Sequence, residues 1–373
     1  MTLKEEYTLK HRIEMVKNWL KEENIDAAFI NSTENVFYLT NFHTDPHERL
    51  MGLFVFPEAE PFVVVPGMEA RQVKDAGWDN EVIGYSDHEN PWDFIADAIQ
   101  ARKITGKKVA FENEVVTYGR SQAFLNIFDS PHVVNVEDKL NEMRLVKDEG
   151  EIAIMRRAAE MADYGVEVGV SALQEGITEM EVLAKIEYEL KKKGIREMSF
   201  STMVLFGEKA GDPHGNPGDR KLKAGDLVLF DLGVVLEGYT SDITRTVAYK
   251  SVSDKQKEIY NTVLKAELAS LEASKPGNRI GDLDQVARDI ITDAGYGDYF
   301  PHRIGHGLGI NVHEFPSMSH LNDGILKEGM TYTIEPGIYV PEIGGVRIED
   351  DVLITKDGHT TLTNYPKELQ IIE

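Results

Sequence analysis

The chain has 373 residues, 42% hydrophobic and 28% charged, with a formal charge of −24 at pH 7, and this length is typical of two domains. The acidic charge disfavours nucleic acid and anionic membrane surfaces as partners, and no apolar run approaches the ~20 residues that a membrane span requires. The absence of cysteine excludes disulfides, thiolate zinc sites and a cysteine nucleophile.

The N-terminal segment is charged and amphipathic. It has no apolar region of the kind found in signal peptides, so we expect a cytoplasmic protein. Residues 11–25 are predicted to form a helix, because Ile13, Val16 and Leu20 recur at helical spacing.

Strand-like and helical segments alternate over the rest of the first third. Helices are predicted over residues 91–102 and 118–128. Short apolar runs bounded by turn residues predict strands over residues 26–30, 50–56, 61–66, 81–85 and 107–112. This alternation predicts a layered α/β domain over residues 1–134, ending near the break at Ser130-Pro131.

Residues 135–373 are predicted to form a second domain with a weak internal repeat. Two helical segments, residues 176–194 and 277–295, are each bracketed by glycine at the same separation. Each follows another predicted helix, over residues 148–172 or 254–273, and precedes strand-like sequence. Two similar helix-helix-strand halves predict an α+β domain with pseudo-twofold symmetry and an active site at the junction of the halves.

Two aspartates of the second domain lie on facing strands of a predicted hairpin, whose turn is Glu237-Gly238. A turn centred between residues 236 and 237 places Asp231 opposite Asp242, whereas a turn centred between 237 and 238 makes them diagonal neighbours. Both registers put the carboxylates on one face. Because facing like charges are destabilising, the pair indicates a cation site. The alternative is one aspartate paired with Arg245 and one exposed.

Three histidines fall within twelve positions among glycines. The glycines make a helix unfavourable at His302 and His306. On an extended strand the two residues share a face, so their imidazoles could converge. A lone histidine is usually structural, but a group of three that includes His313 indicates a functional site.

Glu335 and Glu349 lie on strand-like sequence near the C-terminus. Glu335 precedes Pro-Gly at a strand end, and Arg347 shares a strand face with Glu349. Arg347 either forms a salt bridge with Glu349 or orients a metal-bound carboxylate.

Four carboxylates and one imidazole therefore form a candidate ligand set: Asp231, Asp242, His306, Glu335 and Glu349. Buried carboxylates are costly without a positive partner. This hard, oxygen-rich set favours two divalent ions, Mn²⁺ first and Co²⁺ or Zn²⁺ as alternatives. Two such ions can share bridging carboxylates and a bridging hydroxide, which is the nucleophile, while the ions polarise the scissile carbonyl.

From about Leu140 to Glu373 the chain resembles the pita-bread metallopeptidases, which include prolidase, aminopeptidase P and methionine aminopeptidase. The segments FDLG, SDITR, GHGLG, EPG and RIEDD are similar to the metal-ligand motifs of that family and occur in the same order. The resemblance implies a pita-bread catalytic domain that holds two divalent metal ions.

The resemblance also implies a role for each ligand. Asp231 would bind one metal, Asp242 and Glu349 would bridge both, and His306 and Glu335 would bind the second. Glu335 is in addition the candidate general base.

Further positions resemble residues of the family that surround the metals. His214, in DPHGNPG, is similar to a substrate-side histidine, His302 and His313 to the histidines flanking the metal ligand, and Arg347 to a supporting arginine. Imidazoles near a tetrahedral oxyanion can donate hydrogen bonds or move a proton to the leaving nitrogen.

The first third resembles the creatinase-like N-terminal domain of prolidase, aminopeptidase P and creatinase, which methionine aminopeptidases mostly lack. Creatinase does not keep the metal ligands, so their presence here implies a metallopeptidase. Residues 32–50 are similar to a prolidase loop that reaches the partner's active site in a dimer. Asp45, His47 and Arg49 are its polar members and would bind substrate, or else form an ordinary surface turn.

We therefore predict a cytoplasmic Xaa-Pro dipeptidase of the dimanganese type, a homodimer that cleaves small peptides before proline. Some dipeptide-cleaving members carry an arginine directly after HExP, suited to gripping the product-side carboxylate, where this chain has Ser317 after HEFP. Unless Arg347 or Arg49 substitutes, strict dipeptide preference is in doubt. The alternatives are aminopeptidase P activity on longer Xaa-Pro peptides, a non-catalytic peptide-binding module on the same fold, and a side activity on phosphoesters.

Overall fold

The computed structural model describes residues 3–373. The chain divides into two compact units, Met1–Met143 and Arg144–Glu373, whereas the sequence analysis placed the division after residue 134. The segment after Pro131 stays with the first unit because it adds an edge strand, β6 (His132–Asn135), to the sheet of that unit. The buried Tyr38 hydroxyl then donates to the carbonyl of Met143 at 2.9 Å.

The N-terminal unit is built on one six-stranded sheet with the order β4-β3-β2-β1-β5-β6. β1 pairs antiparallel with β2 and parallel with β5, so the sheet is mixed. Its strands are β1 (Ala27–Ile30), β2 (Gly52–Val55), β3 (Phe62–Pro66), β4 (Glu81–Tyr85), β5 (Lys108–Phe111) and β6. The first five confirm the strands predicted from short apolar runs.

Helices connect and cover these strands. The predicted helix at residue 11 begins earlier, at Leu3, and the other two occur close to their predicted ends. The helices are α1 (Leu3–Glu22), α2 (Thr33–Thr40), α3 (Ala70–Asp75), α4 (Pro91–Ala101), α5 (Tyr118–Leu125) and α6 (Glu137–Leu145). Stacked aromatic rings fill the core, with Phe54 between Phe29 and Phe62 at centroid distances of 4.8 Å.

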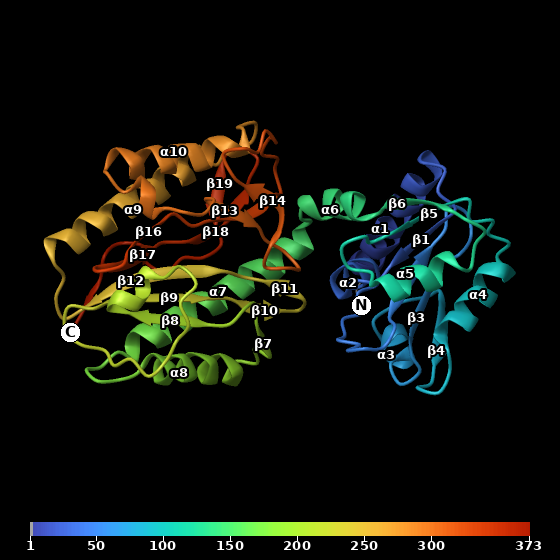
Figure 1. Ribbon diagram of the computed structural model, residues 1–373, viewed down its shortest axis with the longest axis horizontal. Coiled ribbons are helices and arrows are strands. Elements are labelled where there is room, and N and C mark those ends of the chain that lie inside the picture. Colours follow the sequence, from blue (N-terminus) through green and yellow to red (C-terminus); the bar gives the residue numbers. More distant parts are fainter. Residues whose placement is uncertain (1–2) are drawn as a thin grey trace. The chain divides into compact units, whose positions relative to one another are not determined.

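The C-terminal unit consists of two similar halves (Figure 1). In the first half, a helix pair packs on the sheet β20-β12-β9-β8 and on a small sheet β11-β10-β7. Its elements are α7 (Glu149–Ser171), α8 (Glu179–Lys192), β7 (Glu197–Met198), β8 (Met203–Phe206), β9 (Leu227–Leu232), β10 (Val234–Leu236), β11 (Tyr239–Thr240) and β12 (Ile243–Tyr249).

In the second half, another helix pair packs on the sheet β14-β13-β15-β18-β19 and the hairpin β16-β17. Its elements are α9 (Asp254–Ala273), α10 (Ile280–Asp293), β13 (Gly305–Gly307), β14 (Glu314–Met318), β15 (Thr331–Ile334), β16 (Gly337–Val340), β17 (Gly344–Arg347), β18 (Asp350–Ile354), β19 (His359–Thr361) and β20 (Ile371–Ile372). Of these, β20 pairs back onto β12 of the first half.

The internal repeat of the sequence is a repeat of structure. α8 and α10 each have 14 residues. The four bracketing glycines, Gly176, Gly194, Gly277 and Gly295, all have positive φ, a conformation that glycine adopts readily because it has no Cβ. Each half has its own buried apolar cluster, and the strands of the unit lie between the α7–α8 pair and the α9–α10 pair (Figure 1).

The two halves are joined along β12. The Thr246 hydroxyl donates to the carbonyl of Arg347 at 3.0 Å, and the amide of Glu349 donates to the carbonyl of Thr244 at 3.0 Å. Carboxylates of the first half thereby meet those of the second at this junction. Among residues 3–373, no helix is both long and apolar enough to cross a membrane.

Candidate metal centre

The hairpin that carries the two aspartates has the second of the two predicted registers. Asp231 pairs with Thr244, so Asp242 is its diagonal neighbour. Glu237 and Gly238 both have positive φ, as a type I′ turn requires. The turn therefore fixes both carboxylates on one face of the hairpin.

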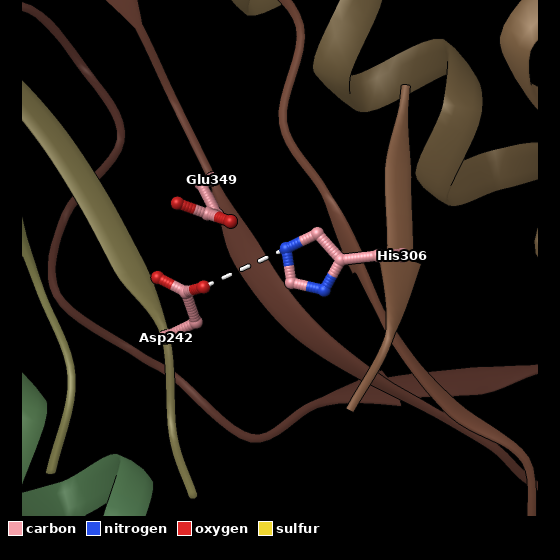
Figure 2. Close-up of side chains that lie close together, drawn as sticks. All are labelled: Asp242, His306 and Glu349. Carbon is pink, nitrogen blue, oxygen red and sulfur yellow. Dashed lines mark ion pairs between the residues drawn. The ribbon is translucent and has the colours of Figure 1, made fainter. Parts of the chain in front are cut away.

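Asp242, His306 and Glu349 form a buried cluster (Figure 2). Each offers one ligand atom, and these atoms all lie within 4.8 Å of one another. Asp242 directly precedes β12, His306 lies in β13, and Glu349 lies between β17 and β18. The cluster therefore joins the two halves of the unit, where the repeat predicted an active site.

The hydrogen bonds of His306 fix which ring nitrogen faces the carboxylates. Nδ1 lies 3.1 Å from the carbonyl of Gly307, and because a carbonyl oxygen only accepts, Nδ1 carries the proton. Nε2 then presents a lone pair, 3.7 Å from Asp242 Oδ2 and 3.4 Å from Glu335 Oε1. Acceptor atoms this close to one another suit a cation.

The electrostatics of these buried groups agree with that reading. Burial, followed by repulsion from Glu349 and Asp231, raises the pKa of Asp242 well above its ordinary value. Burial and repulsion from Glu335 do the same to the pKa of Glu349, and burial raises the pKa of Glu335 to about 7. Asp231 Oδ1 is buried without a hydrogen-bond partner among the described residues. This donor set fits divalent cations, whose charge would relieve the repulsion.

Arg347 holds Asp231, another of the five candidate ligands. Its guanidinium donates to Asp231, to the Thr244 hydroxyl at 3.0 Å and to the Tyr339 hydroxyl at 2.9 Å. The alternative that Arg347 forms a salt bridge with Glu349 is therefore wrong, because Asp231 takes the guanidinium. Glu349 instead accepts from the Thr244 hydroxyl at 2.6 Å.

The histidines around the cluster are arranged differently from the expected His302–His306 pair. The ring that packs on His306 is that of His313, with a centroid distance of 4.1 Å. His302 Nδ1 donates to the carbonyl of Arg303, and Nε2 accepts from Tyr339, both at 2.8 Å. Burial lowers the pKa of His302 to about 4, so this imidazole is neutral at pH 7.

Two residues of the site are not predicted from the sequence: Thr244, which donates to Glu349, and Tyr339, which contacts Arg347 and His302. Thr244 lies two residues after Asp242, so the period of two along a strand could have placed it on the same face. Tyr339 has no such signal, because it reaches Arg347 across the β16–β17 hairpin. Only the pairing of these strands reveals its role.

His214 lies in an exposed turn of the segment that follows β8. Its charge is close enough to lower the pKa of both His302 and His313, after the larger effect of burial. The turn is held by Glu179, a fully buried carboxylate that accepts from the amides of Phe206 at 2.9 Å and Gly218 at 2.8 Å. Lys209 donates to the same carboxylate.

We expect Glu179→Gln to lower the free energy of unfolding by about 1–3 kcal/mol, because a carboxamide accepts on one side only, and its NH2 group must then face either the Phe206 amide or the Gly218 amide and Lys209. Urea denaturation measures the change. Glu272→Gln, at an exposed pair with Lys275, is the control and should stay within about 0.5 kcal/mol of the parent. Equal effects of the two substitutions would contradict this account of Glu179.

The predicted substrate-binding residues of the N-terminal unit form a local turn. The amide of His47 donates to Asp45 Oδ1 at 2.9 Å, and its ring lies 3.3 Å from Asp45 Oδ2. Arg49 forms a two-pronged ion pair with Asp87. These contacts are those of a surface turn. A reach of Asp45, His47 and Arg49 into a partner's site stays a prediction.

Sequence comparison assigns both units. Residues 153–356 match Metallopeptidase family M24, and residues 12–146 match the Creatinase/Prolidase N-terminal domain. A protein of Bacillus subtilis (strain 168) named "Putative dipeptidase YkvY" is 64% identical over 362 residues, which are 97% of this chain and 100% of the relative.

Solved structures of similar proteins cover both units as well. An Xaa-Pro dipeptidase from Bacillus anthracis has a TM-score of 0.90 at 33% identity, over 97% of this chain and 99% of that one. An X-Pro aminopeptidase from Thermotoga maritima MSB8 has a TM-score of 0.85 at 32% identity, over 94% of this chain and 98% of that one. The predicted creatinase-like domain and pita-bread domain are thus confirmed.

Proposed function

Because the chain belongs to metallopeptidase family M24 and carries a creatinase/prolidase N-terminal domain, we propose that it is a dinuclear-metal Xaa-Pro dipeptidase. It would hydrolyse the peptide bond before the proline of an Xaa-Pro dipeptide. Membership of a metallopeptidase family makes the chain a hydrolase and sets aside the alternative of a non-catalytic binding module. The observation that carries the proposal is the buried cluster of Asp242, His306 and Glu349.

We propose that all five predicted residues hold two divalent ions, with Mn²⁺ favoured by the oxygen-rich donor set. Asp242 and Glu349 would contact both ions, Asp231 one, and His306 with Glu335 the other. Bound ions supply a hydroxide nucleophile at neutral pH and polarise the scissile carbonyl. The unpartnered Asp231 Oδ1 and the lone pair of His306 Nε2 support this assignment.

The remaining residues would position groups and move protons. Arg347 fixes Asp231, and Tyr339 connects Arg347 to His302. Both nitrogens of His302 are engaged, so we assign it to orienting Tyr339. His214 and His313 are then the imidazoles that would hydrogen-bond the substrate and deliver a proton to the leaving nitrogen, with Glu335 as general base.

The deciding experiment uses protein stripped with a chelator. We expect no Ala-Pro hydrolysis by the stripped protein and recovered hydrolysis after Mn²⁺ or Co²⁺ is added. The metal should also stabilise the fold by ~4 kcal/mol at a thousand times its dissociation constant, which thermal unfolding measures independently of activity. Lack of Xaa-Pro hydrolysis by fully metal-loaded protein would refute the proposed function.

Aminopeptidase P activity is the second candidate, and the likeness to an X-Pro aminopeptidase favours it. Comparison of Ala-Pro with Ala-Pro-Ala separates the two activities. We expect the dipeptide to have the higher kcat/KM. Faster turnover of the tripeptide would assign the chain to the aminopeptidase activity instead.

The homodimer and the cytoplasmic location stay predictions from the sequence. A dimer would be needed for the turn at Asp45, His47 and Arg49 to reach a partner's site. Light scattering of the purified full chain gives the mass in solution and tests the dimer directly.

A further inference from the structure

Arg303 is an exposed cation beside the metal centre that the mechanism above does not use. It lies between His302, which contacts Tyr339, and β13, which carries His306. Its Nη1 donates to the Ser317 hydroxyl at 3.2 Å. Among residues 9–373, whose side chains the structure describes, no carboxylate forms an ion pair with its guanidinium.

Strand pairing places this guanidinium on the substrate side of the metal ligands. Ser317, in β14, pairs with His306, in β13. Paired residues of an antiparallel ladder point to the same face of the sheet. The Ser317 hydroxyl, and the Arg303 group bonded to it, therefore lie on the face that bears the His306 imidazole.

The positive charge of Arg303 acts on the pKa of three groups of the site. After the larger effect of burial, it lowers the pKa of His306 and of His313. It also acts to lower the pKa of Glu335, whose net shift is upward because of burial. These effects agree with a position close to the place where substrate would bind.

The other cations near the site already have carboxylate partners. Arg347 is buried and donates to Asp231, Thr244 and Tyr339. Arg144 and Lys147 are buried against Glu314. Of these four cations, Arg303 is the one whose guanidinium is exposed and accessible to an anion arriving from solvent.

We propose that Arg303 binds the free carboxylate of the dipeptide's proline and so determines a preference for dipeptides over longer peptides. This inference rests on the proposed function. A guanidinium matches a carboxylate with two parallel hydrogen bonds, and Ser317 holds the fork in place. Arg303 would therefore take the role of the arginine that some dipeptide-cleaving members carry directly after HExP. From the sequence, Arg347 and Arg49 are the candidates for that role.

The test compares Ala-Pro with Ala-prolinamide, which lacks only the charged carboxylate, on the metal-loaded full chain. We expect Arg303→Ala to lower kcat/KM for Ala-Pro by about 10- to 100-fold, mainly through KM, and to leave Ala-prolinamide within about twofold. Competitive inhibition by L-proline should weaken by a similar factor, whereas inhibition by L-prolinamide should not change. Arg303→Lys should retain part of the preference.

Two further variants make the result specific. Ser317→Arg in the Arg303→Ala background should restore the preference for Ala-Pro over Ala-prolinamide, because an arginine at either position would place its guanidinium in the same region. Arg71→Ala, at an exposed pair with Asp75 in α3, removes the same charge elsewhere and should change neither substrate. If wild-type protein cleaves Ala-Pro but Arg303→Ala affects the dipeptide and its amide equally, the inference fails while the proposed function stands. If wild-type protein cleaves neither, the proposed function itself fails.

Discussion

Asp242→Asn is expected to lower kcat for Ala-Pro by at least about a thousandfold while making the metal-free protein more stable. If Asp242 contacts both ions as proposed, its loss should cost more than the 10- to 100-fold in metal affinity typical of a supporting residue. The rate of hydrolysis should fall together with the metal affinity, because bound ions would supply the nucleophile and activate the carbonyl.

The stability gain has an electrostatic cause. Burial and repulsion from neighbouring carboxylates raise the pKa of Asp242 in the folded, metal-free protein. A carboxyl whose pKa is higher in the folded than in the unfolded state destabilises the fold at pH 7, where the unfolded chain would ionise it freely. The neutral amide removes that cost, which is about 1.4 kcal/mol for each unit by which the folded-state pKa exceeds the unfolded-state pKa.

Thermal unfolding with and without Mn²⁺ measures both effects. The metal-free variant should unfold at a higher temperature than metal-free wild type, and added metal should stabilise it much less. Asp289→Asn, at an exposed position on α10, is the control and should behave as wild type in every measurement. A variant that loses activity but keeps full metal stabilisation would contradict the assignment of Asp242 as a ligand.

Arg347→Ala is expected to lower the free energy of unfolding by about 3–5 kcal/mol, because it leaves the carboxylate of Asp231, whose side chain is only 13% exposed, without its cation. Arg347→Lys keeps the charge, but an ammonium group cannot reproduce the fork that reaches Asp231, Thr244 and Tyr339. The lysine variant should therefore still lose about 10- to 100-fold in kcat/KM. Urea denaturation and steady-state kinetics measure the two effects.

Arg157→Lys is the matched control for Arg347. Arg157 forms an exposed pair with Glu237 at 2.8 Å, and such pairs contribute about 0–1 kcal/mol. We expect no loss of activity and little loss of stability. If Arg347→Lys also left activity and stability unchanged, the geometry of the guanidinium would be unimportant and only its charge would matter.

Much of the site could be anticipated because local sequence dictates it. Glu237-Gly238 requires a tight turn, and that turn places Asp231 and Asp242 on one face in either register. Glycines that tolerate positive φ bracket α8 and α10, so the repeat is visible without coordinates. The structure decides between the two registers through the turn itself, in which Glu237 and Gly238 are the two central residues with positive φ.

The wrong or incomplete inferences concern residues whose partners are distant in sequence. One of the two alternatives for Arg347 pairs it with Glu349, two residues away, but its acceptor Asp231 is 116 positions distant. His302 was expected beside His306, yet its partner is Tyr339 on another hairpin. Spacing along one strand gives the face on which a side chain lies, and it does not give what faces that side chain.

The sequence by itself determined the residue types of the cluster, the two-half architecture and the family resemblance. These follow from short-range turn chemistry, periodicity and five motifs in order. The tertiary structure alone decided that Arg347 holds Asp231, that His313 packs on His306, and that Arg303 stands at Ser317. The reason is physical: such contacts form only when strands pair and bring side chains of different segments together, and local propensity carries no information about that pairing.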